Sequence, residues 1–173
     1  TATEPARTAI ISGSCSAATR QQLERAKALW PSLRIDLTAI AEGRPVVEDA
    51  LSWAESQPAD QPVVIFGSAD PAEVAANQQR YGREKAGDMM ERTLAAIAAG
   101  LVRNGVLRLL VAGGETSGAV ISALGIEALS IGEEIAPGVP WTRTISRTPL
   151  SVALKSGNFG GPDFFERALE VAA

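Results

Sequence analysis

The sequence predicts a single α/β domain: a three-layer, mostly parallel open sheet flanked by helices, with an edge portion that could be antiparallel. Three observations support this fold class. Short apolar runs alternate with segments of helical periodicity along the chain. The 173 residues, 46% of them hydrophobic, are enough for one buried core. No internal linker divides the chain, so residues 8–173 are expected to form one domain after a linker at residues 1–7.

The first third of the chain contains two predicted strand–helix units. An apolar strand at residues 8–11 is followed by a Gly/Ser loop and by apolar positions at helical spacing over residues 16–30. Pro31 stops this helix because proline cannot donate the hydrogen bond that a helix interior requires. Residues 33–37 alternate like a half-buried strand, and residues 46–56 carry a second helix with an apolar face.

The middle third repeats the pattern around a more apolar strand. Residues 62–67 form a continuous apolar run, which is typical of a central parallel strand. Residues 70–73 offer a capping box with proline at the first helical position, which predicts the start of a helix. A polar stretch at residues 77–88 then leads into a second helix at residues 89–102, rich in Ala, Leu and Ile.

The closing third begins with one more strand–loop–helix unit and then changes character. Residues 106–112 form an apolar strand, residues 113–118 a Gly-rich loop, and residues 119–124 a helix that ends at Gly125. The strands that follow are expected at one side of the sheet, where at least one could be antiparallel. The remaining expected elements are strand 128–132, turn 137–140, strand 150–155, loop 156–161 and a helix from Pro162 to about residue 171.

Composition and charge exclude several classes of function. The 16 basic and 20 acidic residues give a net charge of -4, so we expect no nucleic-acid partner. The chain has no histidine and one cysteine, Cys15, which excludes Ser-His and Cys-His nucleophile pairs, internal disulfides and Cys/His zinc sites. No apolar stretch approaches the roughly 20 residues that cross a bilayer. We therefore expect no membrane partner and a cytoplasmic location.

Three loops share one design that suits phosphate binding. Each follows an apolar strand, is rich in Gly, Ser, Thr or Asn, and leads toward a helix N-terminus: residues 12–16, 113–118 and 156–161. Helix N-termini present unpaired N–H groups, and glycine allows a bulky anion to approach the backbone. If their strands are parallel, such loops gather at one edge of the sheet. The alternative interpretation of each loop is a tight turn with a helix cap.

The loops match neither standard nucleotide fingerprint, so a different binding mode is predicted. The loop at residues 113–118 lacks the Gly-Lys-Ser/Thr ending of a P-loop, and no G-x-G-x-x-G follows a strand. Thr116 and Ser117 could donate to phosphate oxygens or cap the helix. Glu115 fits a ribose hydroxyl or a magnesium-bound water, or it is a solvated loop acid.

Five other positions have a functional and a structural interpretation. Lys155 could meet a phosphate, or its stem could lie along the sheet with its head in water. Cys15 is expected to be a small buried hydrophobe rather than a reactive thiol. Trp141 could stack on a base but is better explained as a packing anchor. Glu133 and Glu134 could form a carboxylate pair for a divalent ion, although adjacent strand residues face opposite ways.

Ordered motifs extend over nearly the whole chain. Residues 12–16, with Thr19 and Gln22, precede longer motifs at residues 111–120, 131–141 and 154–165. In this order they resemble the C-terminal half of the four-carbon acid sugar kinases, which comprise the 3-oxo-tetronate, D-threonate and D-erythronate kinases. The resemblance implies an ATP-dependent kinase that phosphorylates the terminal hydroxyl of such an acid, with this chain as its nucleotide-binding domain.

The resemblance also implies a division of labour between two domains. The acid sugar would be bound by an N-terminal domain that nothing in this chain matches, so this domain alone is expected to be inactive. The implied cofactors are ATP and Mg²⁺, and neither a catalytic base nor a protein ligand of the metal is predicted. The residues expected to contact ATP are Ser12, Ser14, Gly113, Gly114, Glu115, Thr116, Ser117, Gly157 and Asn158.

Two interpretations from other classes stay open at this point. The chain could be a non-catalytic module that binds a nucleotide or a sugar phosphate. It could also be an interaction protein, because adjacent Phe164 and Phe165 on a helix cannot both face one core. One of them is then expected at an interface, such as that of a homodimer.

Overall fold

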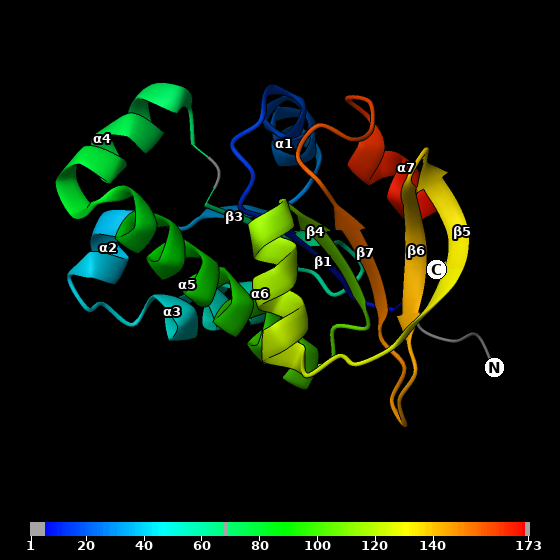
Figure 1. The fold of residues 1–173 in the computed structure, drawn as a ribbon. Coiled ribbons are helices and arrows are strands. Elements are labelled where there is room, and N and C mark those ends of the chain that lie inside the picture. The colour runs from blue at the N-terminus through cyan, green and yellow to red at the C-terminus, as the bar shows by residue number, and fades with distance from the viewer. Residues whose placement is uncertain (1–5, 68, 172–173) are drawn as a thin grey trace.

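The computed structural model describes residues 6–67 and 69–171, which form a seven-stranded mixed sheet flanked by helices (Figure 1). The strand order is β2-β3-β1-β4-β7-β6-β5. Strands β2, β3, β1, β4 and β7 are parallel to one another, whereas β6 runs antiparallel to β7 and β5 antiparallel to β6. The predicted fold class is confirmed. The strands are β1 Thr8–Ser12, β2 Ser32–Arg34, β3 Val63–Phe66, β4 Arg108–Ala112, β5 Leu129–Ala136, β6 Val139–Thr144 and β7 Ser151–Lys155.

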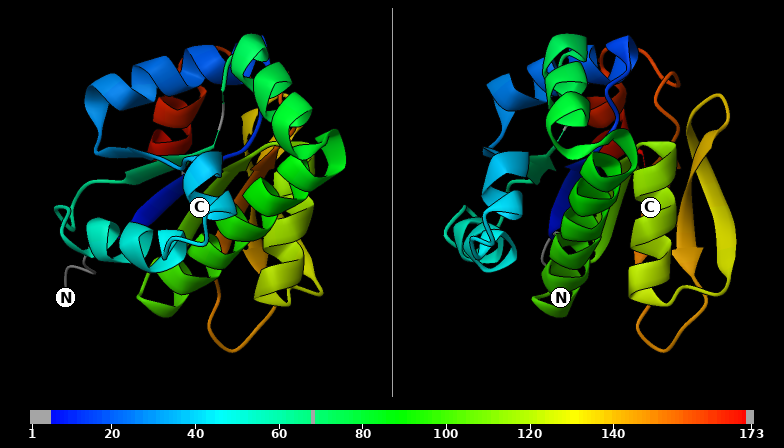
Figure 2. Two further views of the ribbon diagram at one scale, coloured as in Figure 1. Left: turned by 90° about the vertical axis from the view of Figure 1, so that its left-hand side faces the viewer. Right: turned by 60° about the vertical axis from the view of Figure 1, so that its left-hand side comes forward.

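Helices cover both faces of the sheet and make three layers (Figure 2). On one face α3, α5 and α6 bury a large apolar cluster, and on the other α1 and α7 bury a second cluster. Successive residues of β1 alternate between them, with Ile11 in the first cluster and Ile10 in the second. The helices are α1 Ala17–Leu29, α2 Leu37–Ala41, α3 Val46–Glu55, α4 Pro71–Tyr81, α5 Arg83–Arg103, α6 Gly114–Leu124 and α7 Phe164–Glu170.

The start of the domain lies slightly earlier than predicted. Residues 1–5 of the predicted linker lie outside the described residues. Arg7, also assigned to the linker, is tied to the domain because its carbonyl accepts hydrogen bonds from Leu107 and Arg108 N–H. Its guanidinium donates to the carbonyl of Ala54. Arg7 therefore belongs to the packed domain.

The polar stretch at residues 77–88, to which the sequence analysis assigned no secondary structure, is helical, so the helix expected from residue 89 begins earlier. Helix α4 continues to Tyr81 and α5 begins at Arg83, with a break only at Gly82. Gly82 has φ +87°, a backbone conformation that side chains with a Cβ rarely adopt. Polar side chains concealed these helical turns because α4 packs mainly on α5 and has no fully buried residue.

Two predicted boundaries between elements are wrong for local reasons. Leu37 was expected in a strand, but it begins α2 because the Asp36 side chain accepts a hydrogen bond from Thr38 N–H at 3.0 Å and caps the helix. The loop predicted at residues 113–118 is already helical from Gly114. Only Gly113, with φ +124°, makes the turn out of β4.

The last three strands lie at one side of the sheet and include antiparallel pairs, as predicted, but β6 was missed. It takes in Val139 and Pro140 of the predicted turn, so only Pro137 and Gly138 form the hairpin turn, with φ +83° at Gly138. Trp141 on β6 is buried, and its Nε1 donates to the carbonyl of Ala168 at 2.9 Å. It is a packing anchor, so the base-stacking interpretation is wrong.

Both phenylalanines of α7 are buried, contrary to the expectation that one lies at an interface. Phe164 and Phe165 are 1% and 2% exposed, and their rings meet edge to face with centroids 5.7 Å apart. Both fit the same cluster because α7 contacts α1 on one side and β5 on another, so more than one of its faces is covered. The argument that suggested a homodimer therefore falls away.

No helix among residues 6–67 and 69–171 is long and apolar enough to cross a membrane.

Candidate functional site

The three predicted loops meet at one edge of the sheet because their strands β1, β4 and β7 are parallel neighbours. Backbone hydrogen bonds join the loops. Gly13 and Ser14 N–H donate to the carbonyl of Ala112 at 3.0 and 3.2 Å, at the end of β4. Gly113 N–H donates to the carbonyl of Lys155 at 2.7 Å, at the end of β7. The loops thus form one continuous surface, as the sequence predicted.

The first and third loops are also joined through side chains. Ser16 caps α1 by accepting from Thr19 N–H, and the hydroxyls of Ser16 and Thr19 donate to the carbonyl of Gly157 at 2.6 and 3.0 Å. Gly157 packs so closely that an added Cβ would lie 2.5 Å from the hydroxyl of Ser14. Glycine is therefore required here by close approach.

Lys155 is buried beneath these two loops. Its side chain is 1% exposed, and its Nζ donates to Thr19 Oγ1 at 3.0 Å, to the carbonyl of Gly157 at 2.9 Å and to that of Ser156 at 3.2 Å. The interpretation with its head in water is wrong. No carboxylate in the described part of the chain pairs with it. Burial lowers the pKa of the Lys155 ammonium to about 8.

The position of the Gly157 carbonyl determines what the third loop presents outward. Three donors hold this carbonyl inward. In a trans peptide the C=O and the following N–H point in opposite directions, so the N–H of exposed Asn158 points away from Lys155. A buried positive charge without a carboxylate partner and an outward N–H together favour an anion above the loop.

The second loop is the N-terminus of α6. Gly114 and Glu115 are exposed, whereas Thr116 and Ser117 are buried. A Cβ on Gly13 would lie 2.1 Å from Thr116 Oγ1, so glycine in the first loop lets α6 approach. Ser117 Oγ has no hydrogen-bond partner within residues 6–67 and 69–171. The unpaired first-turn N–H groups of α6 add a partial positive charge.

Not every predicted contact residue lies at the surface of this site. Ser14, Gly114, Glu115, Gly157 and Asn158 are at least partly accessible at the meeting point of the loops. Gly113, Thr116 and Ser117 are buried directly behind them, and Ser12 is fully buried as the last residue of β1. These four residues therefore shape the site through their backbone. The side chain of Ser12 is the most enclosed of the four.

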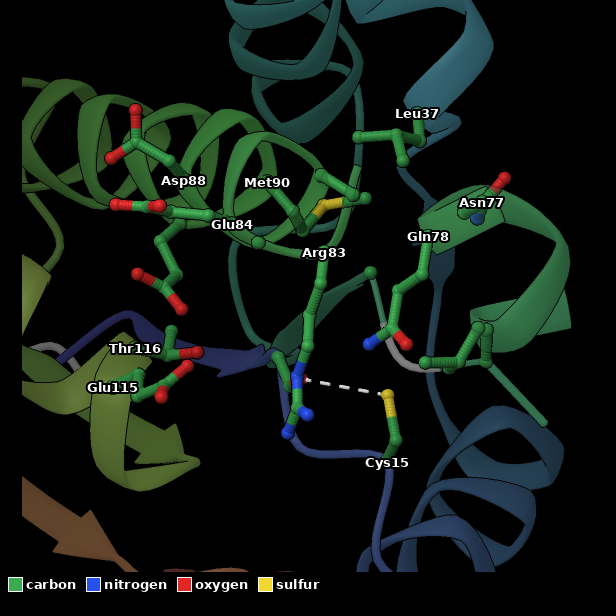
Figure 3. Close-up of a pocket in the computed structure, with 17 residues that line it drawn as sticks. Cys15, Leu37, Asn77, Gln78, Arg83, Glu84, Asp88, Met90, Glu115 and Thr116 are labelled. Atoms are coloured by element: carbon green, nitrogen blue, oxygen red, sulfur yellow. Dashed lines mark hydrogen bonds between the residues drawn. The ribbon is translucent and has the colours of Figure 1, made fainter. Parts of the chain in front are cut away.

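A cavity of about 600 Å³ adjoins the first two loops (Figure 3). Gly13, Cys15, Glu115 and Thr116 belong to the loops and also line the cavity. Cys15 is exposed, so the expectation of a buried cysteine is wrong. The rest of the wall comes from the start of α2, from α4 and α5, and from residues just after β3, none of which was predicted as part of the site. The capping box at residues 70–73 was the available signal that a helix begins beside this edge.

Glu91 of α5 faces Glu115 across the cavity wall. Burial of Glu91, its hydrogen bond to Glu115 and repulsion from Glu115 and Asp88 raise the pKa of the Glu91 carboxyl to about 7. The protonated Glu91 carboxyl, which is still populated near neutral pH, can therefore donate a hydrogen bond to Glu115. The oxygen atoms of this pair can accept hydrogen bonds from hydroxyl groups or from water molecules bound to a cation.

Replacing Glu91 by glutamine should change how stability depends on pH. The folded protein holds the Glu91 proton up to about pH 7, while the unfolded chain releases it near 4.5, so the free energy of unfolding falls as the pH rises from about 4.5 to about 7. In Glu91→Gln this fall should shrink. Because the group is partly solvated, we expect the Tm difference between pH 5 and pH 8 to narrow by about 2–4 °C. Thermal denaturation of both proteins at pH 5 and pH 8 measures this difference. An equal change in Tm between the two pH values for both proteins would contradict the carboxyl pairing.

The described residues offer no complete metal site. No group of three or more Cys, Asp or Glu side chains within residues 6–67 and 69–171 is arranged to hold a metal ion. Glu134 instead closes the β5–β6 hairpin, where its Oε1 accepts from Gly138 N–H at 2.8 Å. One oxygen of the predicted Glu133–Glu134 carboxylate pair is thus engaged in the hairpin.

These features define a class of protein. An open α/β sheet carries three joined loops with glycines, free N–H groups and a buried cation at the carboxyl ends of adjacent parallel strands, beside a cavity. Such an arrangement is typical of α/β domains that bind phosphate-containing ligands, and the cavity leaves room for a larger ligand.

Comparison with known proteins identifies the family. Residues 9–165 match the family of nucleotide-binding C-terminal domains, and this chain belongs to that family. It is 54% identical over 160 residues to the 3-oxo-tetronate kinase of Burkholderia multivorans, covering 92% of this chain and 37% of the relative. It is 53% identical over 166 residues to that of Methylobacterium radiotolerans, covering 95% and 39%. The chain thus spans well under half the length of these relatives.

A solved structure agrees with the fold. A Haemophilus influenzae protein superposes with a TM-score of 0.91 at 34% identity, covering 96% of this chain and 40% of the other. The resemblance to four-carbon acid sugar kinases noted from the motifs is confirmed by these matches.

Proposed function

We propose that this chain is the ATP-binding C-terminal domain of a kinase that phosphorylates the terminal hydroxyl of a four-carbon acid sugar of the 3-oxo-tetronate, D-threonate or D-erythronate type. The observation that carries the proposal is the joining of the three loops by hydrogen bonds, with Lys155 buried beneath two of them. The kinase relatives, of which this chain matches less than half, support the reaction class. The acceptor would be bound by a further domain, so the isolated chain should bind nucleotide without transferring phosphoryl groups efficiently.

In this proposal each loop has a separate role toward the phosphates. The N-terminus of α6, with Gly114, Glu115, Thr116 and Ser117, receives one phosphate group through its N–H donors. Gly157 and Asn158 receive a second phosphate group above Lys155. Ser12, Gly113 and Ser14 keep the backbone between these two positions in place.

Magnesium fits this site only as a partner of the bound phosphates. The described residues lack a three-ligand cluster, while Glu115 and Glu91 offer oxygen acceptors beside the loops. Oxygen is the ligand type that Mg²⁺ prefers, usually with several waters retained. The ion would neutralise phosphate charge, and Glu115 would hold its water shell.

Calorimetric titration of the chain with ATP, with and without Mg²⁺, tests the proposal. We expect saturable binding of Mg-ATP that is tighter than binding of AMP or of a sugar phosphate. Tighter binding of AMP or a sugar phosphate would instead indicate a non-catalytic binding module. Absence of ATP binding would contradict the proposed role of the loops.

A further inference from the structure

The cavity between α4, α5 and the loop after β1 extends well beyond the three loops. Its volume of about 600 Å³ lies within the range of small-molecule and cofactor sites, roughly 300–1,000 Å³. Gly13, Glu115 and Thr116 line it and also belong to the loops, so the cavity and the loop surface are continuous. A ligand held on the loops could therefore extend into it.

The cavity has one apolar and one charged end. Leu37 and Met90 supply apolar wall on the side away from the loops, while Arg83 and Glu115 reach toward the loops (Figure 3). Val74 is a further apolar residue of the lining. In the same view the side chains of Gln78 and Arg83 point into the space, whereas that of Asn77 points away from it.

Two glycines line the cavity in different ways. Met90 packs directly against Gly67, where an added Cβ would lie 2.3 Å from Met90 Sδ, so a larger residue would displace the methionine. Gly87 of α5 faces open space, where an added Cβ would find only Glu91 Oε1, 3.9 Å away. Gly87 therefore leaves open space in the cavity wall, while Met90, packed over Gly67, offers an apolar surface on which a planar ring could lie.

Charge excludes the triphosphate from this cavity. Four acidic side chains line it, against Arg83 as the basic residue of the lining: Glu84, Asp88, Glu91 and Glu115. A bare polyphosphate would be repelled there. A small polyhydroxy acid fits poorly at the apolar end, because its hydroxyl groups would be buried without partners.

We infer that this cavity is the nucleoside subsite, which holds the base of a purine nucleotide while the three loops hold its phosphates. The inference rests on the proposed function. The base lies between the apolar side chains of α4 and α5, with the Gln78 amide offering one donor and one acceptor to its edge. The ribose hydroxyls face the Glu91–Glu115 pair, which accepts their hydrogen bonds. Arg83, which has no ion pair in the described part of the chain, neutralises charge between ribose and phosphate.

A substitution at Gly87 can fill the cavity without touching the loops. Gly87→Leu places a side chain into open space, and replacing glycine inside a helix favours folding because glycine is a poor helix former. Ala96→Leu is the matched control, because Ala96 is an exposed residue of the same helix outside the cavity lining.

The two variants and the unaltered chain are titrated with Mg-ATP, with adenosine and with inorganic tripolyphosphate. In Gly87→Leu we expect the Kd for ATP to rise by about tenfold or more and adenosine binding to be lost. The Kd for tripolyphosphate should stay within about twofold, since the loops are intact. Ala96→Leu should match the unaltered chain with all three ligands.

Each contrary result has a separate meaning. Unchanged ATP affinity in Gly87→Leu, or an equal loss for ATP and tripolyphosphate, would overturn the nucleoside subsite while leaving ATP binding by the chain established. If the unaltered chain binds neither ATP nor tripolyphosphate, the proposed function itself fails.

Discussion

Replacing Gly114 by leucine should abolish Mg-ATP binding and leave the Tm unchanged or higher. Gly114 is the first residue of α6, is exposed, and has no heavy atom within 4 Å of an added Cβ. The new side chain therefore strains nothing in the protein, and leucine is the better helix former. It would occupy the space in which we place a phosphate group, at the N–H donors of the helix.

Ala123→Leu provides the control for Gly114→Leu. Ala123 is an exposed residue of the same helix, more than two turns from the loop. Calorimetry should give normal ATP affinity for this variant and none for Gly114→Leu, and circular dichroism should show both folded. Retained ATP affinity in Gly114→Leu would remove the second loop from the site.

Replacing Lys155 by methionine should weaken ATP binding by about 10- to 100-fold while changing stability little at neutral pH. The ammonium lies under the third loop with no carboxylate partner among the described residues, so its removal leaves no unpaired acid. Methionine fills a similar volume, and exchange of a buried charge for an apolar group is often neutral or stabilising. The lost affinity corresponds to a charge-assisted interaction of about 1.5–3 kcal/mol.

A pH series separates this electrostatic role from a purely structural one. Burial lowers the pKa of Lys155 to about 8, so ATP affinity of the unaltered chain should fall as the pH rises through and above 8. Lys155→Met should show no such fall. Lys27→Met, which removes an exposed charge from α1, should keep the pH dependence. Identical pH profiles for the unaltered chain and Lys155→Met would contradict the electrostatic role.

Lys155 should also make the free energy of unfolding depend on pH, in a direction that follows from its lowered pKa. Its pKa is about 8 in the folded protein and about 10.5 in the unfolded chain, so the unfolded chain binds the proton more tightly. The contribution of Lys155 to the free energy of unfolding should therefore rise as the pH rises from about 8 to about 10.5. Lys155→Met lacks this rise, which chemical denaturation at pH 8 and pH 10 can measure.

Local sequence patterns predicted the strands and loops well. Each parallel strand named from an apolar run is present, because strands buried on both faces need apolar side chains at every position. That the three loops would share an edge followed from the rule for parallel strands. Helical turns at residues 77–88 and strand β6 were missed because exposed turns and edge strands carry a weaker apolar pattern.

Only the tertiary structure decided how the loops pack together. The contact of Lys155 with Thr19 joins residues 136 positions apart, and its existence depends on β7 lying beside β4, which no local pattern encodes. The same holds for the cavity, which exists only because α4 turns back on α5 at Gly82. The sequence by itself determined the fold class, the loop chemistry and the family resemblance, since periodicity and motifs are properties of neighbouring residues. Burial, pKa and cavity shape depend on segments that are distant along the chain, so only packing could establish them.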